Sequence, residues 1–200
     1  MPTLPNVLTD IANLALIEIG EDIITNIDAS TTPSTIVKAV IYQTIREVQK
    51  LIDWPELRVI KSLNRRAVMR DETYYYYNLP SNFLDFIEAD ECKYYFLEAG
   101  FVASNSDALE ITYKKYTDNP AEWSADMTEL IYRKLAEKIS PVLTENPQIT
   151  QISSQKYGLA EERCLARTQN RQSKRRYYNK NHSWVQNRQD GNLSSRYRRR

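Results

Sequence analysis

The feature that most constrains the fold is a change in hydrophobic periodicity that occurs twice along the chain. Apolar residues recur at helical spacing up to about residue 52 and again from Ser124 onward. Between these segments, residues 57–116 contain short aromatic and β-branched runs separated by Asn, Pro, Gly and Ser. This pattern predicts an α+β fold: a mainly α-helical core of about four helices, a small antiparallel β insertion and an extended C-terminal tail.

The same pattern predicts three parts. A helical core would combine residues 1–56 with residues 117–172, and the β-rich insertion would occupy residues 57–116. Residues 173–200 would form a basic C-terminal arm, because they contain too few aliphatic side chains to bury a core of their own. We expect this arm to be mobile in the free subunit and to become ordered on a partner.

Helix boundaries follow from caps and prolines. The first two predicted helices end at Gly20 and at Trp54-Pro55, and Thr32-Pro33 begins the second. Ser124 caps the third helix, Pro141 is expected to kink or loosen its end, and Asn146-Pro147 begins the fourth. Each predicted helix has an apolar face. On the first helix it consists of Val7, Leu8, Ile11, Leu14 and Ala15, and on the second of Ile36, Val37, Val40, Ile41, Thr44, Ile45, Val48, Leu51 and Ile52. On the third it consists of Met127, Leu130, Ile131, Leu135, Ile139, Val142 and Leu143, and on the fourth of Ile149, Ile152, Lys156, Leu159, Ala160, Cys164 and Arg167.

Short strands are predicted at residues 74–77, 83–87, 94–97 and 109–116. In the four consecutive tyrosines from Tyr74 to Tyr77, alternate side chains would face opposite sides, so that one pair packs inward. A base-stacking platform is the alternative interpretation of these tyrosines. Trp54 and Trp123 each lie where a helical segment meets the strand-rich one, which predicts that both pack at that junction.

Charge is distributed unevenly along the chain. Up to Ala160 there are 15 Lys+Arg and 23 Asp+Glu, a net charge of −8, and from Glu161 onward there are 12 and 3, a net charge of +9; together they give the overall +1. A basic segment that follows an acidic body has two plausible partners, nucleic acid or an acidic protein surface such as another copy of the chain.

Residues suited to catalysis or metal binding are scarce. The single histidine, His182, lies in the basic arm, the cysteines Cys92 and Cys164 are far apart, and four glycines cannot make a phosphate-binding loop. The sequence therefore predicts a protein that is not an enzyme, without catalytic, cofactor-binding or metal-binding residues. The carboxylates Asp85, Glu88, Asp90 and Glu91 are interpreted as solvated, although a carboxylate pair cannot be dismissed from sequence. No segment predicts a membrane span or a signal peptide, so we expect folding in a cytoplasm.

The arm interleaves cations with aromatic residues, which favours docking over simple solvation. Arginine pairs with carboxylates through two parallel hydrogen bonds, and aromatic rings supply rigid contact area. The predicted partner-binding residues are Arg175, Arg176, Tyr177, Tyr178, Trp184, Arg196 and Arg198.

Several segments, taken in their order along the chain, resemble those of a known protein family. They are Trp54 followed by Leu57-Arg58, the stretch YYYYNLPSNFLDF, Leu109 to Tyr113, Asp118-Asn119-Pro120 with Trp123, and the helix that closes in Pro141-Val142-Leu143-Thr144; Gln155, Tyr157, Ala160 and Ala166 follow on the final helix. Over roughly residues 5–172 this arrangement resembles tubular tail protein A and related head-to-tail adaptors of short-tailed phages.

The resemblance implies a structural virion protein without cofactors. Such adaptors form a ring, commonly of twelve copies, between the portal protein and the tail nozzle or a second ring protein, and genomic DNA passes through the ring without sequence-specific binding. It implies synthesis in the host cytoplasm and a final place at the connector of the virion. The arginine-rich end is not part of the resemblance, and a nucleic-acid-binding protein that acts through this basic tail is the alternative function.

Overall fold

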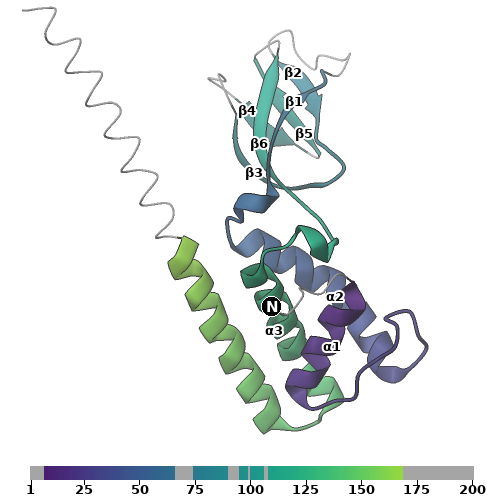
Figure 1. The fold of residues 1–200 in the computed structure, drawn as a ribbon. Helices are drawn as coiled ribbons and strands as arrows, with labels where there is room; N and C mark the ends of the chain where they lie inside the picture. Colours follow the sequence, from purple (N-terminus) through teal and green to yellow (C-terminus); the bar gives the residue numbers. More distant parts are fainter. Residues whose placement is uncertain (1–6, 66–73, 90–94, 99, 106–107, 169–200) are drawn as a thin grey trace, which may run out of the picture. The chain divides into compact units, whose positions relative to one another are not determined.

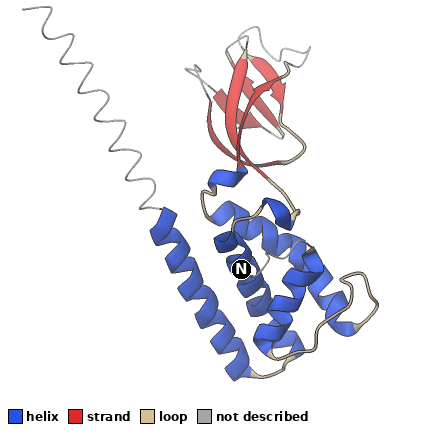
Figure 2. Ribbon diagram, viewed as in Figure 1, coloured by secondary structure: helices blue, strands red, loops and turns tan. Residues whose placement is uncertain are grey.

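The computed structural model describes residues 7–65, 74–89, 95–98, 100–105 and 108–168. It confirms the α+β fold: four helices accompany small antiparallel sheets within these residues (Figures 1 and 2). The chain divides into two compact units, one up to Ala160 and one from Glu161 onward. The C-terminal arm, residues 173–200, lies outside the described residues.

Helix α1 (Leu8–Ile19) ends at Gly20 as predicted. Gly20 has a left-handed backbone (φ 82°), and its N–H and that of Glu21 donate to the carbonyls of Ile17 and Leu16, the hydrogen bonds of a Schellman cap. The predicted apolar face is partly wrong, because Val7 and Leu14 are exposed. The buried face consists of Ile11, Ala12, Ala15, Leu16 and Ile19. Apolar residues occupy both sides of this helix, so their spacing did not determine which side would be buried.

Helix α2 (Thr32–Leu51) begins one residue earlier than predicted. Its N-cap is Thr31, whose hydroxyl oxygen accepts from the backbone N–H of Ser34, and Pro33 occupies the first turn. The central apolar positions Val37, Ile41, Ile45 and Val48 are buried as expected. Leu51, however, is exposed, and the predicted face is wrong at that position.

Helix α3 (Ala125–Leu143) is capped by Ser124, whose hydroxyl oxygen accepts from Met127 N–H, as predicted. The helix continues past Pro141 to Leu143. Pro141 has no N–H to donate to the Glu137 carbonyl, and the hydroxyl of Ser140 donates to that carbonyl instead (3.2 Å). Val142 was placed on the apolar face, but it is exposed. The packing of α3 against both α1 and α2 builds the helical part of the first unit.

The fourth helix covers residues 147–168. Asn146 caps it as predicted, since its side-chain oxygen accepts from Gln148 N–H (2.9 Å). Its buried positions are Ser153, Tyr157 and Ala160 in the first unit and Cys164 in the second. Ile152 and Leu159, which were predicted to be buried, are exposed.

Six strands form two three-stranded antiparallel sheets. The first sheet has the order β1 (Arg58–Leu63), β6 (Leu109–Lys115) and β3 (Phe83–Ala89). The second has the order β2 (Tyr75–Asn78), β5 (Phe101–Ser104) and β4 (Tyr95–Glu98). The four predicted strands are confirmed within one or two residues, whereas β1 and β5 were missed.

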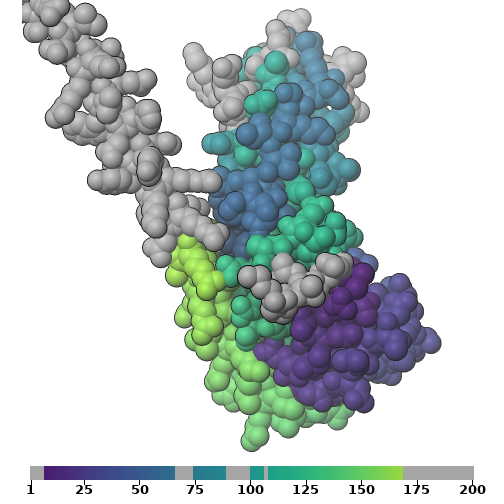
Figure 3. Space-filling model, viewed as in Figure 1, coloured from purple at the N-terminus to yellow at the C-terminus, as the bar shows by residue number. Residues whose placement is uncertain are grey.

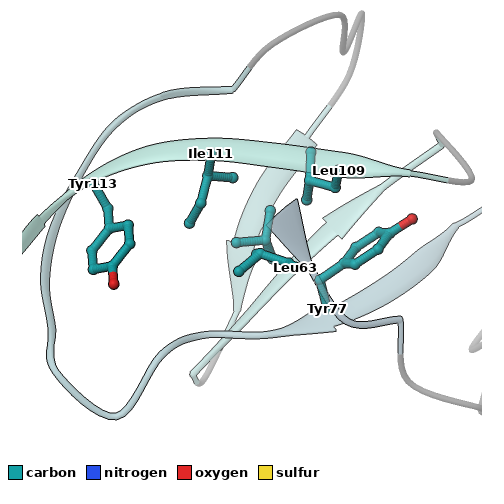
Figure 4. Packing of buried hydrophobic residues seen from close by; sticks show 6 residues of the cluster. Leu63, Tyr77, Leu109, Ile111 and Tyr113 are labelled. Carbon is teal, nitrogen blue, oxygen red and sulfur yellow. The ribbon is translucent and has the colours of Figure 1, made fainter. Parts of the chain in front are cut away.

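Residues from both sheets share one hydrophobic core (Figure 4). Leu109, Ile111 and Tyr113 alternate on the buried side of β6, as the sequence predicted for this strand. Tyr77 from β2 is fully buried in the same core, and Tyr75 packs against it, so this pair points inward as expected. Tyr76 contacts Phe101 edge-on, with ring centroids 6.4 Å apart.

Candidate interaction surfaces

The two tryptophans that the sequence predicts at the junction, Trp54 and Trp123, are buried beside the end of α2. Trp54, which is 4% exposed, donates from its indole Nε1 to the Val48 carbonyl (3.0 Å). Trp123, which is 3% exposed, donates to the Thr117 carbonyl (3.3 Å). Trp54 precedes the short 3₁₀ helix η1 (Pro55–Leu57), and Trp123 follows η2 (Pro120–Glu122). The chain enters and leaves the strand-rich part through these two segments, so both rings lie where it joins the helices.

A buried amide that sequence reasoning missed connects the two segments. Gln49 donates from Nε2 to the Thr117 carbonyl (2.6 Å), and its Oε1 accepts from Thr117 N–H (3.3 Å). The Gln49 side chain is fully buried. Its position in the sequence was a usable signal, because residue 49 falls at helical spacing between Ile45 and Ile52, both buried.

Further polar contacts tie the same region together. The carboxylate of Glu56 accepts from the backbone N–H of Ser124 (3.3 Å), and the ammonium of Lys114 donates to the Lys50 carbonyl (3.1 Å). A hydrogen bond from Arg58 to Asp53 raises the pKa of the Arg58 guanidinium, against the effect of its burial. The residues of this junction therefore bond to one another, which indicates that they stabilise the fold.

A second polar cluster joins three helices of the first unit. Glu18 on α1 accepts from Arg133 on α3 (3.3 Å) and lies 3.2 Å from the ammonium of Lys156 on the fourth helix. Arg133 also pairs with Glu129 one turn earlier. The Glu18 side chain is only 9% exposed, and its Oε2 has no hydrogen-bond partner among the described residues, so part of the attraction in this cluster offsets the cost of burying the charge.

The first candidate surface is the α1 face, defined as Val7, Asp10, Leu14 and Ile17. These four positions follow one another at spacings of three, four and three residues and are all exposed. Ile17 is 60% exposed and Leu14 37%. Helices that are apolar on all sides are normally buried on all sides, so this face is one that a partner would cover. In Figure 3, the darkest purple segment, which includes α1, forms part of the visible surface.

The second candidate surface is the α2 face, defined as Lys38, Tyr42, Arg46 and Lys50 with the adjoining Tyr116. All four α2 residues are exposed, and Tyr42 is 45% exposed. The guanidinium of Arg46 lies 5.1 Å from the ring centroid of Tyr116, within cation–π range. Burial and the nearby Asp118 raise the pKa of the Tyr116 hydroxyl, so this ring stays neutral near pH 7.

A third exposed apolar pair lies on the fourth helix. Ile152 is 50% exposed and Leu159 is 54% exposed, and they lie seven residues apart on one side of the helix. The nearest cation on this side, Lys156, is already paired with Glu18.

All seven predicted partner-binding residues lie outside the described part of the chain. They are Arg175, Arg176, Tyr177, Tyr178, Trp184, Arg196 and Arg198, and the same applies to His182, Cys92, Asp90 and Glu91. Of the two described carboxylates from the predicted acidic group, Asp85 lies 3.5 Å from the Lys114 ammonium and Glu88 is exposed. Across the described residues, no group of three His, Cys, Asp or Glu side chains could hold a metal ion.

Within the same described ranges, none of the helices combines the length and the apolar character needed to cross a bilayer. A scan against protein-family models and a search of the curated proteins found no match to this chain.

Proposed function

We propose that this chain is a structural subunit of a ring of identical copies, the adaptor that joins the head of a short-tailed phage to its tail. The ordered resemblance to such adaptors between residues 5 and 172 supports this function. On this proposal the ring, of about twelve copies, contacts the portal protein on one side and the tail nozzle or a second ring protein on the other. DNA passes through its centre, and the protein is part of the virion.

The observation that carries the proposal is the exposed apolar side of α1. Leu14 and Ile17 are exposed on a helix whose opposite side is already buried against the rest of the unit. Isolated exposed apolar residues need no explanation, but a row of them at helical spacing is characteristic of a surface that is covered in an assembly.

A closed ring also requires two different contact surfaces on each subunit, because each copy touches its two neighbours through opposite sides. The α1 face and the α2 face belong to separate helices that both pack on α3. This arrangement supplies a subunit with two distinct surfaces held by one helical scaffold.

The charge of the chain suits passage of DNA. Residues up to Ala160 carry a net charge of −8, and an acidic wall repels phosphates and keeps DNA from adhering. We expect acidic side chains to outnumber basic ones on the surface of the channel. A channel lined mainly by arginine would instead indicate a protein that grips DNA.

Electron microscopy and mass measurement of the purified chain, alone and mixed with portal rings, test this function. The expected result is a closed oligomer, formed or stabilised when the portal is present. A chain that remains monomeric with every virion partner would contradict the proposal.

The uneven charge favours a second candidate function, a nucleic-acid-binding protein that acts through the basic tail. The segment from Glu161 onward carries a net charge of +9. Binding through about six phosphate contacts would weaken roughly a thousandfold between 50 and 200 mM salt. A filter-binding or fluorescence titration of duplex DNA across that salt range separates this function from the adaptor.

A further inference from the structure

We infer that the α1 face of one copy docks on the α2 face of the next copy, and that this contact is the repeating interface of the ring. The inference rests on the proposed ring function and adds to it which two surfaces meet. The occupant of each face is thus a second copy of this chain.

The two faces are complementary in charge. The α1 sequence contains no Lys or Arg, and its exposed charge is Asp10, since Glu18 is turned inward to Arg133 and Lys156. The α2 face carries Lys38, Arg46 and Lys50. Lys38 pairs with the exposed Asp28 (2.7 Å), and the one acid of α2, Glu47, pairs with Lys138 on α3. The α1 face is therefore negative, and Arg46 and Lys50 supply the positive charge of the α2 face.

The two faces also match in the kind of contact they offer. The α1 face supplies the branched aliphatic side chains Leu14 and Ile17, whereas the α2 face supplies Tyr42 and the stacked pair of Arg46 and Tyr116. Tyrosine and arginine are enriched among the residues that contribute most to binding energy at protein interfaces, where they pack against apolar surface. The Arg46 stem and the Tyr42 ring can cover aliphatic side chains while the guanidinium reaches Asp10.

Self-pairing of either face is disfavoured. Two α1 faces would bring Asp10 side chains into one interface, and two α2 faces would bring together Arg46 and Lys50 of each copy. Like charges at an interface weaken binding, which acts against these pairings. Charge thus selects the contact between unlike faces, and that contact can propagate around a ring.

Two variants of the full chain test the contact. One combines Leu14→Asp with Ile17→Asp and disables the α1 face, and the other combines Tyr42→Asp with Arg46→Glu and disables the α2 face. Leu159→Asp is the matched control, since Leu159 is as exposed as these residues but lies on the fourth helix. All of these side chains are exposed, and circular dichroism with thermal melting checks that each variant is folded.

The assay is chemical cross-linking followed by mass measurement on denaturing gels. Wild-type chain and Leu159→Asp should give ladders that extend to the full ring. Each face variant alone should lose dimers and all higher species by at least tenfold. A one-to-one mixture of the two variants should restore a dimer, because each contributes one intact face, but nothing larger.

Other outcomes separate the inference from the proposed function. If one face variant dimerises with itself, or if both variants form wild-type ladders, the interface is wrong while the ring remains. A ladder that is lost in Leu159→Asp but kept in both face variants assigns the interface to the fourth helix. Wild-type chain that gives no ladder with or without portal rings overturns both the inference and the ring.

Discussion

At the scale of single residues, Gln49 shows how one buried amide can hold two parts of a chain together. Both of its hydrogen bonds go to the backbone of Thr117, which is 68 residues away along the chain. In the Gln49→Leu variant, Thr117 N–H loses its acceptor in a buried environment. We expect a loss of about 1–3 kcal/mol in the free energy of unfolding, measured by urea denaturation.

The matched control for that substitution is Gln43→Leu. Gln43 is an exposed amide on the same helix that bonds only to Glu47 one turn later. We expect a change of less than about 0.5 kcal/mol for this variant. Equal effects of the two substitutions would show that the Gln49–Thr117 contact contributes nothing specific.

Trp54 is the second residue whose replacement should be costly. Its ring is almost completely buried, so Trp54→Ala removes apolar contacts and leaves a cavity. We expect a loss of about 3–5 kcal/mol in the free energy of unfolding, and Trp123→Ala should behave similarly. The exposed Tyr42→Ala provides the comparison. An unchanged melting temperature for Trp54→Ala would mean that the junction packs differently from this description.

The pH dependence of stability should report on Glu47. Burial acts to raise the pKa of this carboxyl, but hydrogen bonds from Lys138 and Gln43 bring it below its ordinary value. A pKa that is lower in the folded state stabilises the fold above the ordinary pKa near 4.5, and this contribution disappears as the pH falls through the folded value. Lys138→Met should therefore cost about 0.2–1 kcal/mol at pH 7 and much less near pH 3. A difference between the two proteins that stays constant from pH 7 to pH 3 would contradict this.

At the scale of helices and strands, the existence of elements was easier to predict than their orientation. Capping residues gave the end of α1 at Gly20 and the start of α3 at Ser124, because those signals are local. The buried side of α1 was not predictable from periodicity, since Leu14 and Ile17 are as apolar as the residues that pack inward. The exposed apolar side of α1, which the prediction misplaced, is also a side that suggests a partner.

The two missed strands have a similar physical explanation. Strand β1 is an edge strand with exposed polar and charged side chains, which dilute the alternation expected of a strand. Strand β5 has only four residues, and the last three are all buried, so it shows no alternation of buried and exposed positions. For Gln49, the helical spacing indicates that the side chain is buried, but nothing in the sequence identifies Thr117 as its hydrogen-bond partner.

The end of α3 offers a test of how a helix accommodates proline. Ser140 Oγ donates to the Glu137 carbonyl that would otherwise bond the missing N–H of Pro141. Ser140→Ala should cost about 1–2 kcal/mol, because that carbonyl loses its donor. In a Pro141→Ala background the backbone N–H returns, and the same serine substitution should cost much less. Equal costs in the two backgrounds, measured by a double-mutant cycle, would contradict this role of Ser140.

At the scale of the whole molecule, the opposed charges of the body and the C-terminal segment set the expectation for assembly. Truncation after Gln172 removes the predicted arm but no residue of the described helices. We expect a folded chain with a near-normal Tm, because the sequence of the arm has too few aliphatic side chains to form a core of its own. Attachment of the ring to its neighbours should be impaired, which sedimentation with portal rings would measure.

The same truncation distinguishes the two functions considered for the arm. Loss of salt-sensitive DNA binding with normal ring attachment would favour contact with nucleic acid. Truncated chain that assembles into infectious particles as well as the full chain does would exclude a docking role for the arm.

The way the strands interrupt the helical part has a consequence for the order of folding. Helices α2 and α3 pack together although 73 residues separate Leu51 from Ala125 (125 − 51 − 1). Closing a flexible loop of that length costs about 4 kcal/mol in chain entropy, whereas the pairing of β1 with β6 places Arg58 opposite Lys114 and so holds the two ends of the insertion close together. Since the strands are also synthesised before α3, we expect β1 and β6 to pair first and α3 to pack on α2 afterwards.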